Sequence, residues 1–256
     1  MTAIKYVLGS ICSLAIIFLC LFVSIMLPTF TPAFYEHEYT KQVVDKSNPN
    51  IARRIYPLYK DYKVDRLYMN IERDELMKVT RHMLDYMKGK NDDMRIDAVV
   101  AGVKAPFFSE RSVRHMVDVK KLFMGGFFLR NIALVALVVT ILALMALKAN
   151  ALRVIAKSFR VTVVSFAVLV TALIVVATLN FEKAFVQFHH MFFDNDLWML
   201  NGYQDLLVDM VPLGFFIDIC IFIVSLLLLS LIVLFVVSNF ILRKNGDNKA
   251  NAGAGA

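Results

Sequence analysis

Residues 219–242, ICIFIVSLLLLSLIVLFVVSNFIL, contain no charged side chain, and neither do residues 6–35, YVLGSICSLAIIFLCLFVSIMLPTFTPAFY. A helix needs about 20 apolar residues to cross a hydrocarbon core of about 30 Å. Strands of a membrane barrel would alternate in polarity instead. These two uninterrupted runs therefore predict membrane-spanning helices, and they decide the fold class.

The composition points the same way. Of the 256 residues 59% are hydrophobic and 19% are charged, which excludes a cytosolic globular enzyme. The formal net charge is +7. In a membrane protein, an excess of basic residues usually lies in cytoplasmic loops or near lipid headgroups. We therefore expect membrane lipids as neighbours and no nucleic acid as a partner.

The whole chain reads as an all-α polytopic membrane protein, with four transmembrane helices and a mostly helical extracytoplasmic cap. The expected spans are residues 1–28, 122–147, 161–179 and 213–242. The expected connections are the cap at 29–121, a basic cytoplasmic loop at 148–160, an aromatic-rich extracytoplasmic loop or interfacial helix at 180–212, and a disordered cytoplasmic tail at 243–256.

Charges in the short connections predict the orientation. Residues 148–160 carry four basic side chains and no acid, whereas residues 180–212 carry five acids and one lysine. Basic short loops stay in the cytoplasm, and a long loop crosses largely regardless of its charge. We therefore expect both termini in the cytoplasm and the cap outside.

Within the cap, residues 70–89 have apolar side chains at helical spacing and predict an amphipathic helix that Asn70 caps and Gly89 ends. Ser109 is expected to open a second helix with Glu110 in its first turn. Nothing breaks this helix before Gly125, so we expect it to continue into the second span.

Residues 109–119, SERSVRHMVDV, form the first candidate site. On a helix Arg111, His115 and Asp118 share one face. A carboxylate one turn from an imidazole can fix its tautomer and stabilise its charged form. The competing interpretation is a solvated polar face.

Residues 181–203 form the second candidate site, where an aromatic stripe surrounds His189. An imidazole in an apolar wall stays neutral, which suits a general base. An aromatic belt with a hydrogen-bonded structural histidine is the alternative. Asp218, just inside the fourth span, is either a functional carboxylate or a solvated one. The stripe consists of Phe181, Phe185, Phe188 and Phe192, and Phe193, Trp198 and Tyr203 follow it.

Metal and cofactor motifs are missing from the sequence. His189 and His190 are neighbours, so on a helix they point about 100° apart, a poor arrangement for two ligands of one metal ion. There is no H-E-x-x-H and no G-x-S-x-G. We therefore expect no metal and no cofactor.

The two segments together resemble the lipoprotein intramolecular transacylase family, Lit. The resemblance lies in Phe-His-x-x-Phe-Phe at 188–193, Trp198, Asp-Leu-Leu at 205–207 and Pro212 before Phe215-Phe216, together with Glu-Arg-x-x-x-His-Met-x-Asp-Val at 110–119. It implies a bacterial cell-membrane enzyme whose active site lies at the outer leaflet. Its substrate is a lipoprotein with a diacylglyceryl group on the N-terminal cysteine. The sn-2 acyl chain moves to the cysteine α-amine and leaves a lyso-form lipoprotein.

The resemblance also implies the site residues. His115 and His189 are the expected catalytic acid and base, and which is which stays open. The family motif has one histidine where this chain has two, so His190 is also a candidate. The expected supporting residues are Glu110, Arg111, Asp118 and His190. The expected substrate-binding residues are Phe185, Phe188, Phe192, Phe193, Trp198, Phe215 and Phe216.

Two other classes of protein fit the spans. A non-enzymatic membrane assembly or transport partner with a protein-binding cap would not need its histidines. A metal-dependent membrane hydrolase would lose activity with a chelator.

Overall fold

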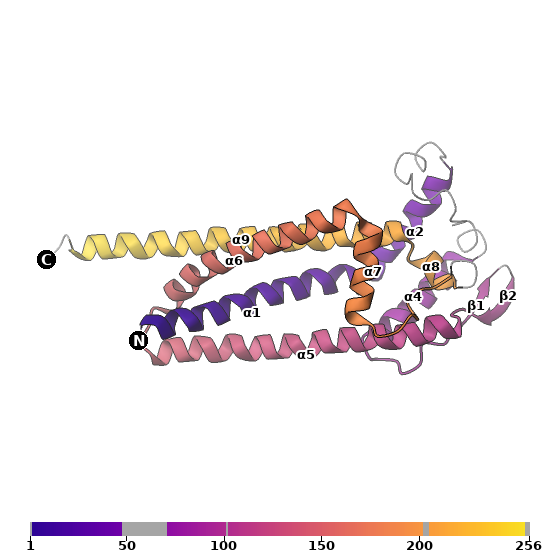
Figure 1. Cartoon of the computed structure of the whole chain (residues 1–256), viewed down its shortest axis with the longest axis horizontal. Helices are drawn as coiled ribbons and strands as arrows, with labels where there is room; N and C mark the ends of the chain where they lie inside the picture. Colours follow the sequence, from indigo (N-terminus) through magenta and orange to yellow (C-terminus); the bar gives the residue numbers. More distant parts are fainter. Residues whose placement is uncertain (1, 48–70, 101, 202–204, 254–256) are drawn as a thin grey trace. The chain divides into compact units, whose positions relative to one another are not determined.

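The structure is a computed structural model that describes residues 2–47, 71–100, 102–201 and 205–253. Four of its helices are long and apolar enough to cross a membrane (Figure 1). They are α1 (Thr2–Thr29), α5 (Glu110–Ala146), α6 (Ala151–Leu179) and α9 (Leu213–Gly253). The chain divides into two compact units, described separately below. The bundle unit comprises Met1–Ile25, Gly126–Gln187 and Ile223–Ala256, and the cap unit comprises Met26–Gly125 and Phe188–Phe222.

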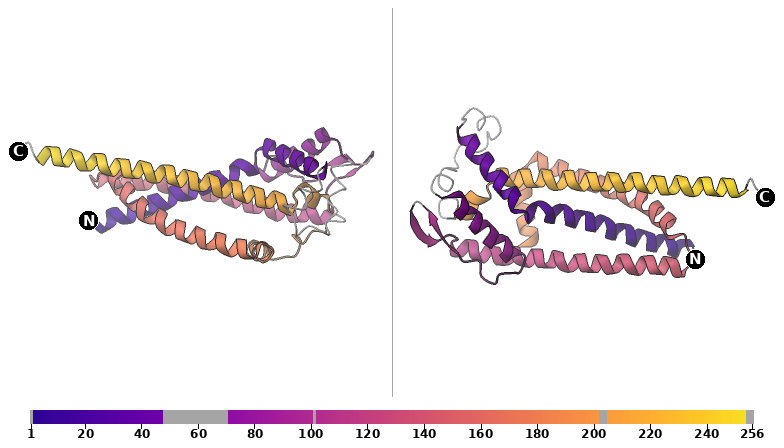
Figure 2. Two further views of the ribbon diagram at one scale, coloured as in Figure 1. Left: turned by 90° about the horizontal axis from the view of Figure 1, so that it is seen from above. Right: turned by 180° about the vertical axis from the view of Figure 1, so that it is seen from behind.

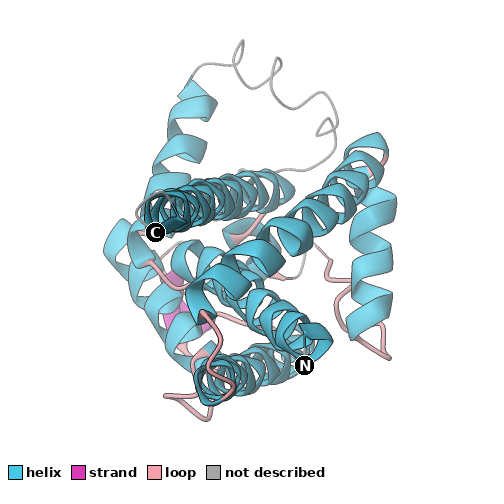
Figure 3. Cartoon of the chain, turned by 90° about the vertical axis from the view of Figure 1, so that its left-hand side faces the viewer, coloured by secondary structure: helices cyan, strands magenta, loops and turns pink. Residues whose placement is uncertain are grey.

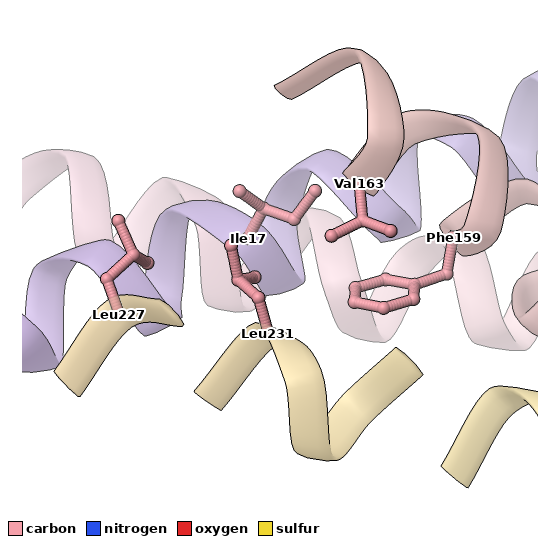
Figure 4. Packing of buried hydrophobic residues seen from close by; sticks show 5 residues of the cluster. All are labelled: Ile17, Phe159, Val163, Leu227 and Leu231. Carbon is pink, nitrogen blue, oxygen red and sulfur yellow. The ribbon is translucent and has the colours of Figure 1, made fainter. Parts of the chain in front are cut away.

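Parts of all four long helices pack together in the bundle unit (Figure 2). Ile17 of α1 contacts a buried cluster from α6 and α9 (Figure 4). Phe22 of α1 also meets Phe127 of α5 edge to face. A Cβ on Gly9 would lie 2.5 Å from Ser158 Oγ, so α1 and α6 approach closely only because this residue has no side chain. The other members of the cluster are Phe159, Val163, Leu227 and Leu231.

The first turn of α1, the α5–α6 connection and the last turns of α9 lie at one end of the bundle unit, which faces the viewer in Figure 3. The loop expected at 148–160 is wrong in its extent, because α6 is already helical from Ala151. Asn150 caps the helix by accepting a hydrogen bond from the Arg153 backbone N–H at 3.1 Å. The basic residues from Arg153 onward therefore lie on α6.

The C-terminal tail also differs from the expectation. Residues 243–253, expected to be disordered, continue α9 as far as Gly253. No proline follows Leu242. Extending an existing helix costs far less free energy than starting one, so the backbone hydrogen bonds of the fourth span can continue beyond its apolar part.

The cap unit is mostly helical. It contains α2 (Pro32–Ser47), α4 (Arg73–Met87) and α8 (Leu206–Met210), and the Tyr39 hydroxyl of α2 hydrogen-bonds Thr80 of α4 at 2.9 Å. The predicted amphipathic helix is α4, which buries Leu76, Val79 and Met83. The N-cap of α4 is Glu72, so the expected cap at Asn70, which lies outside the described residues, is wrong.

A β-hairpin in the cap unit was not expected. Strands β1 (Asp97–Val100) and β2 (Val103–Pro106) pair antiparallel, with Asp97 opposite Pro106 and Val100 opposite Val103. They are the only strands in the described part of the chain. Each strand has only four residues, too few to show a convincing alternation in the sequence.

Helix α5 runs without a break from Glu110 to Ala146, as predicted. Its first turns, as far as Gly125, belong to the cap unit, and the rest of the helix from Gly126 onward belongs to the bundle unit. A short helix, α7 (Phe181–Phe192), follows α6 and carries His189. These two helices supply the candidate site.

Candidate active site

His115 of α5 and His189 of α7 lie together in the cap unit, with ring centroids 6.3 Å apart. They are 74 residues apart in the sequence and were expected to act together. His189 is buried, with 8% of its surface exposed, and His115 is half-buried. Two imidazoles at this separation can both reach one small reacting group.

Aromatic rings wall the histidine pair. Phe193 lies 5.5 Å from the His115 ring and 5.7 Å from the His189 ring. Trp198 stacks on His189 at 4.6 Å, and Phe188 meets His189 edge to face at 5.5 Å. Phe193 and Trp198 are themselves buried, so the wall shields the pair from water.

The surroundings keep His115 uncharged. Burial, together with the nearby His189, lowers the pKa of His115 to about 4, although Asp118 acts in the opposite direction. His115 stands seven residues before the spanning segment, in turns that carry Arg111, Asp118 and other charged groups. At neutral pH its imidazole is therefore free to accept a proton.

The predicted helix face is real, but its partners are different. The Arg111 guanidinium donates a hydrogen bond to the Asp196 carbonyl oxygen. Asp118 accepts hydrogen bonds at 3.0 Å from the Asn195 amide and from Lys121 Nζ. Among the described residues, the hydrogen bonds of Asp118 go to these two donors and not to the His115 imidazole. Arg111 and Asp118 thus hold the segment after α7 against α5, on either side of His115.

A second clamp on the same segment was missed from the sequence. Asp205 has 3% of its surface exposed, and its Oδ1 accepts hydrogen bonds from the hydroxyls of Ser109 and Ser112, the latter at 3.0 Å. Its Oδ2 accepts from the Asn201 backbone N–H at 2.7 Å. Asp205 appeared in the sequence only as part of a family motif. Its buried network fixes the start of α5 one turn before His115.

Two of the predicted supporting residues lie away from the histidine pair. Glu110 pairs with Arg95 through two hydrogen bonds of 3.1 Å on the exposed surface. His190 is exposed and touches the edge of Trp198 at 5.4 Å. Of the two adjacent histidines, His189 is the one whose ring faces His115.

The predicted substrate-binding aromatics fall into different places. Phe188, Phe193 and Trp198 contact His189, as described above. Phe192 packs on Phe188 at 4.8 Å, and both rings are exposed. Phe185 contacts Phe181 at 6.3 Å within the bundle unit. Phe215 packs on Phe34 and Tyr35 of α2, and Phe216 packs on Phe215.

Asp218 belongs to a separate polar cluster in the cap unit. It pairs with Lys41 of α2, next to Glu38, which has 4% of its surface exposed. Burial raises the pKa of Glu38 to about 7, with Asp218 adding to the rise and Lys41 opposing it. Asp218 is therefore neither isolated nor simply solvated.

In the described ranges, no three His, Cys, Asp or Glu side chains gather as metal ligands would. The chemistry available from these residues is that of two imidazoles in an aromatic wall. Four spanning helices with such a pair define an integral membrane protein suited to acid–base chemistry on an amphiphilic molecule.

Comparison with known protein families identifies the family within this class. The chain belongs to the family of lipoprotein intramolecular transacylases, Lit, because the family's sequence pattern matches residues 10–216. The search of curated proteins gave no match. The predicted family and enzyme class are confirmed.

Solved structures share the fold. The chain resembles the in meso structure of the membrane integral lipoprotein intramolecular transacylase Lit from Bacillus cereus, with a TM-score of 0.70 and 18% identity over 96% of this chain and 99% of that one. A variant of the same Bacillus cereus protein, with one histidine replaced by arginine, gives a TM-score of 0.67 and 17% identity over 96% of each chain. This likeness confirms the predicted fold class.

Proposed function

We propose that this transacylase moves the sn-2 acyl chain of a diacylglyceryl-modified lipoprotein to the α-amine of its N-terminal cysteine. The product is a lyso-form lipoprotein with an N-acyl and an S-monoacylglyceryl group. The observation that carries this proposal is the His115–His189 pair, 6.3 Å apart and set in an aromatic wall. Donor and acceptor belong to one molecule, so no acyl-enzyme is needed.

The histidines supply the proton transfers. The α-amine has a pKa of about 8 and must lose a proton as its nitrogen attacks the ester carbonyl. His115 accepts that proton, because its pKa of about 4 keeps it neutral at physiological pH. The bond from the carbonyl carbon to glycerol O2 then breaks, and O2 takes a proton from the histidine pair through His189. Solvent takes the first proton of the ammonium form, and the second passes from His115 to His189 and on to O2. Both rings are then neutral again, and the cycle needs no other reactant.

The aromatic wall around the histidine pair also orients the substrate, so that its α-amine and its ester lie close together. Holding two reacting groups in one geometry can replace a large part of the entropic barrier. Phe193 and Trp198 are buried against the histidines and exclude water, which would otherwise hydrolyse the ester. The exposed rings of Phe188 and Phe192 offer an apolar surface for acyl chains.

We infer that the site works at the outer leaflet and that both termini are cytoplasmic. The basic residues of 148–160 and the acidic residues of 180–212 support this orientation. His115 precedes Leu122 by seven residues of continuous helix, about 10 Å at 1.5 Å per residue. Labelling of Asn150→Cys by an impermeant reagent added outside intact cells would contradict this topology.

Mass spectrometry of a lipoprotein N-terminus tests the reaction. Cells that express the chain should convert diacylglyceryl lipoprotein to the lyso form, and cells that express His115→Ala at equal level should not. A non-enzymatic membrane partner would give the same lipoprotein in both. Peptides blocked at the α-amine should accumulate unchanged in vitro, because the nucleophile is missing.

A further inference from the structure

A cavity in the bundle unit lies between α6 and α9, and the proposed reaction makes no use of it. Its volume is about 410 Å³, and two arginines face it from different helices, Arg160 from α6 and Arg243 from α9. The rest of the lining comes from α9 and is Phe235, Val236, Asn239 and Phe240.

Among the described side chains, Arg160 and Arg243 have no carboxylate as an ion-pair partner, and no carboxylate lines the cavity. The Arg160 guanidinium lies 5.9 Å from the Phe235 ring, which turns it along the wall of the cavity. Two positive groups on one cavity repel each other, and a shared anion between them removes that cost.

The position of the two arginines relative to the hydrocarbon layer indicates which kind of anion they can bind. Arg160 directly precedes the apolar stretch of α6, and Arg243 directly follows the apolar run of α9 that ends at Leu242. Both therefore mark the edge of the hydrocarbon layer, where lipid phosphates lie. Arginine pairs with phosphate through two parallel hydrogen bonds, so it suits this group particularly well.

The remaining lining is amphiphilic, as a phospholipid is. Val236 and Phe240 are exposed apolar side chains beside the cavity and can contact the upper part of an acyl chain. The Asn239 amide stands among them and can bond an ester or glycerol oxygen. None of the residues that line the cavity is an acid that could receive the ammonium of a zwitterionic headgroup.

The same segment of α6 adds further positive charge. Arg153 and Lys157 line a second cavity of about 310 Å³ at this end of the bundle unit. The buried Nε of Arg153 has no hydrogen-bond partner among the described residues. The field near Arg160 is thus strongly positive, which favours an anionic lipid over a neutral one.

We propose that the cavity between α6 and α9 binds the headgroup of an anionic phospholipid, with its phosphate between Arg160 and Arg243. The glycerol and first carbons of the acyl chain lie against Val236 and Phe240. This lipid is not the substrate, and its site does not include the histidine pair.

Native mass spectrometry of the full chain in detergent tests the proposal, with phosphatidylglycerol as the probe. The double variant Arg160→Gln, Arg243→Gln should bind it at least about tenfold more weakly, because the loss of a hydrogen bond between charged groups alone is worth about that factor. The matched control is Lys148→Gln, Lys244→Gln, which removes the same charge from exposed positions outside the cavity and should bind within about twofold of the parent chain.

Three results would overturn the proposal. They are an equal loss in the control variant, equal binding of phosphatidylcholine, and displacement of the lipid by inorganic phosphate at the same concentration. The variant Arg160→Lys, Arg243→Lys keeps the charge and should recover part of the binding, which separates a lost contact from a misfolded chain. Transacylation of a lipopeptide in detergent should be unchanged in every variant, so failure here leaves the proposed function intact.

Discussion

Replacement of His115 by alanine is the sharpest test of the proposed acid–base pair. With a pKa of about 4, only about one His115 ring in a thousand is charged at pH 7. Nearly every molecule can therefore use His115 as a base. Use of the same ring as the initial acid would cost about 4 kcal/mol, because three pKa units each cost about 1.36 kcal/mol. We therefore propose His115 as the base.

Loss of one general base typically slows a reaction by about 10²- to 10⁴-fold. We expect His115→Ala and His189→Ala each to lower kcat within this range and to change KM little, because substrate binding rests mainly on the aromatic wall. The assay is the initial rate of lyso-lipopeptide formation by purified protein in detergent at pH 7, followed by mass spectrometry. His190→Ala is the control, and because His190 is exposed its rate should stay within about threefold of the parent rate.

The reasoning fails if His115→Ala keeps more than a tenth of the parent rate while it is folded and inserted. It also fails if His190→Ala is inactive and His189→Ala is active, because the aromatic helix would then present the other ring to His115. Added imidazole should restore part of the His115→Ala rate if the lost function is proton transfer, and it should not restore a variant that lost only packing.

Further outcomes follow from the neighbours of the pair. Asp118→Asn should move the acidic limb of the pH–kcat profile to lower pH, because the Asp118 charge raises the His115 pKa. An unchanged limb would mean that Asp118 acts only structurally, through its hydrogen bond with Asn195. Asp205→Asn should lower the free energy of unfolding by about 1.5–3 kcal/mol and reduce kcat, since it weakens a buried charged acceptor, and chemical denaturation would measure the first effect. Glu38→Gln should raise the melting temperature at pH 8. The pKa of Glu38 is higher in the folded protein than in the unfolded chain, so protonated Glu38 stabilises the fold below about pH 4.5, and this stability is lost as the pH rises through about 7. The variant cannot ionise at this position and should not show the decline. EDTA should leave the rate of transacylation unchanged, and recovery of a chelator-treated enzyme by zinc would favour a metal-dependent hydrolase instead.

The spans were predictable because lipid imposes a local requirement. Residues 6–27 and 219–242 contain no charged side chain, and the length of these runs is enough to predict that each spans the membrane. The shared face of Arg111, His115 and Asp118 was equally local, because helical spacing fixes it. Helix α5 confirms that face.

The partners of these residues were not predictable. Asp118 bonds Asn195, which lies 77 residues further on, and Asp205 bonds Ser109 across 96 residues. A sequence pattern carries no signal for a polar pair at such a separation, since only the tertiary fold brings the two together. The nearer acid was therefore assigned to the histidine, and the more distant one was overlooked.

The stacking of Trp198 on His189 at 4.6 Å has a practical consequence, since Trp198 is the only tryptophan in the chain. A protonated imidazole quenches indole fluorescence more strongly than a neutral one. The native, unlabelled protein therefore carries one fluorophore in contact with one proposed catalytic ring. Because Trp198 also contacts His190, its emission will respond to the protonation of both rings, and a change on mixing with lipopeptide will report the moment at which the aromatic wall is occupied.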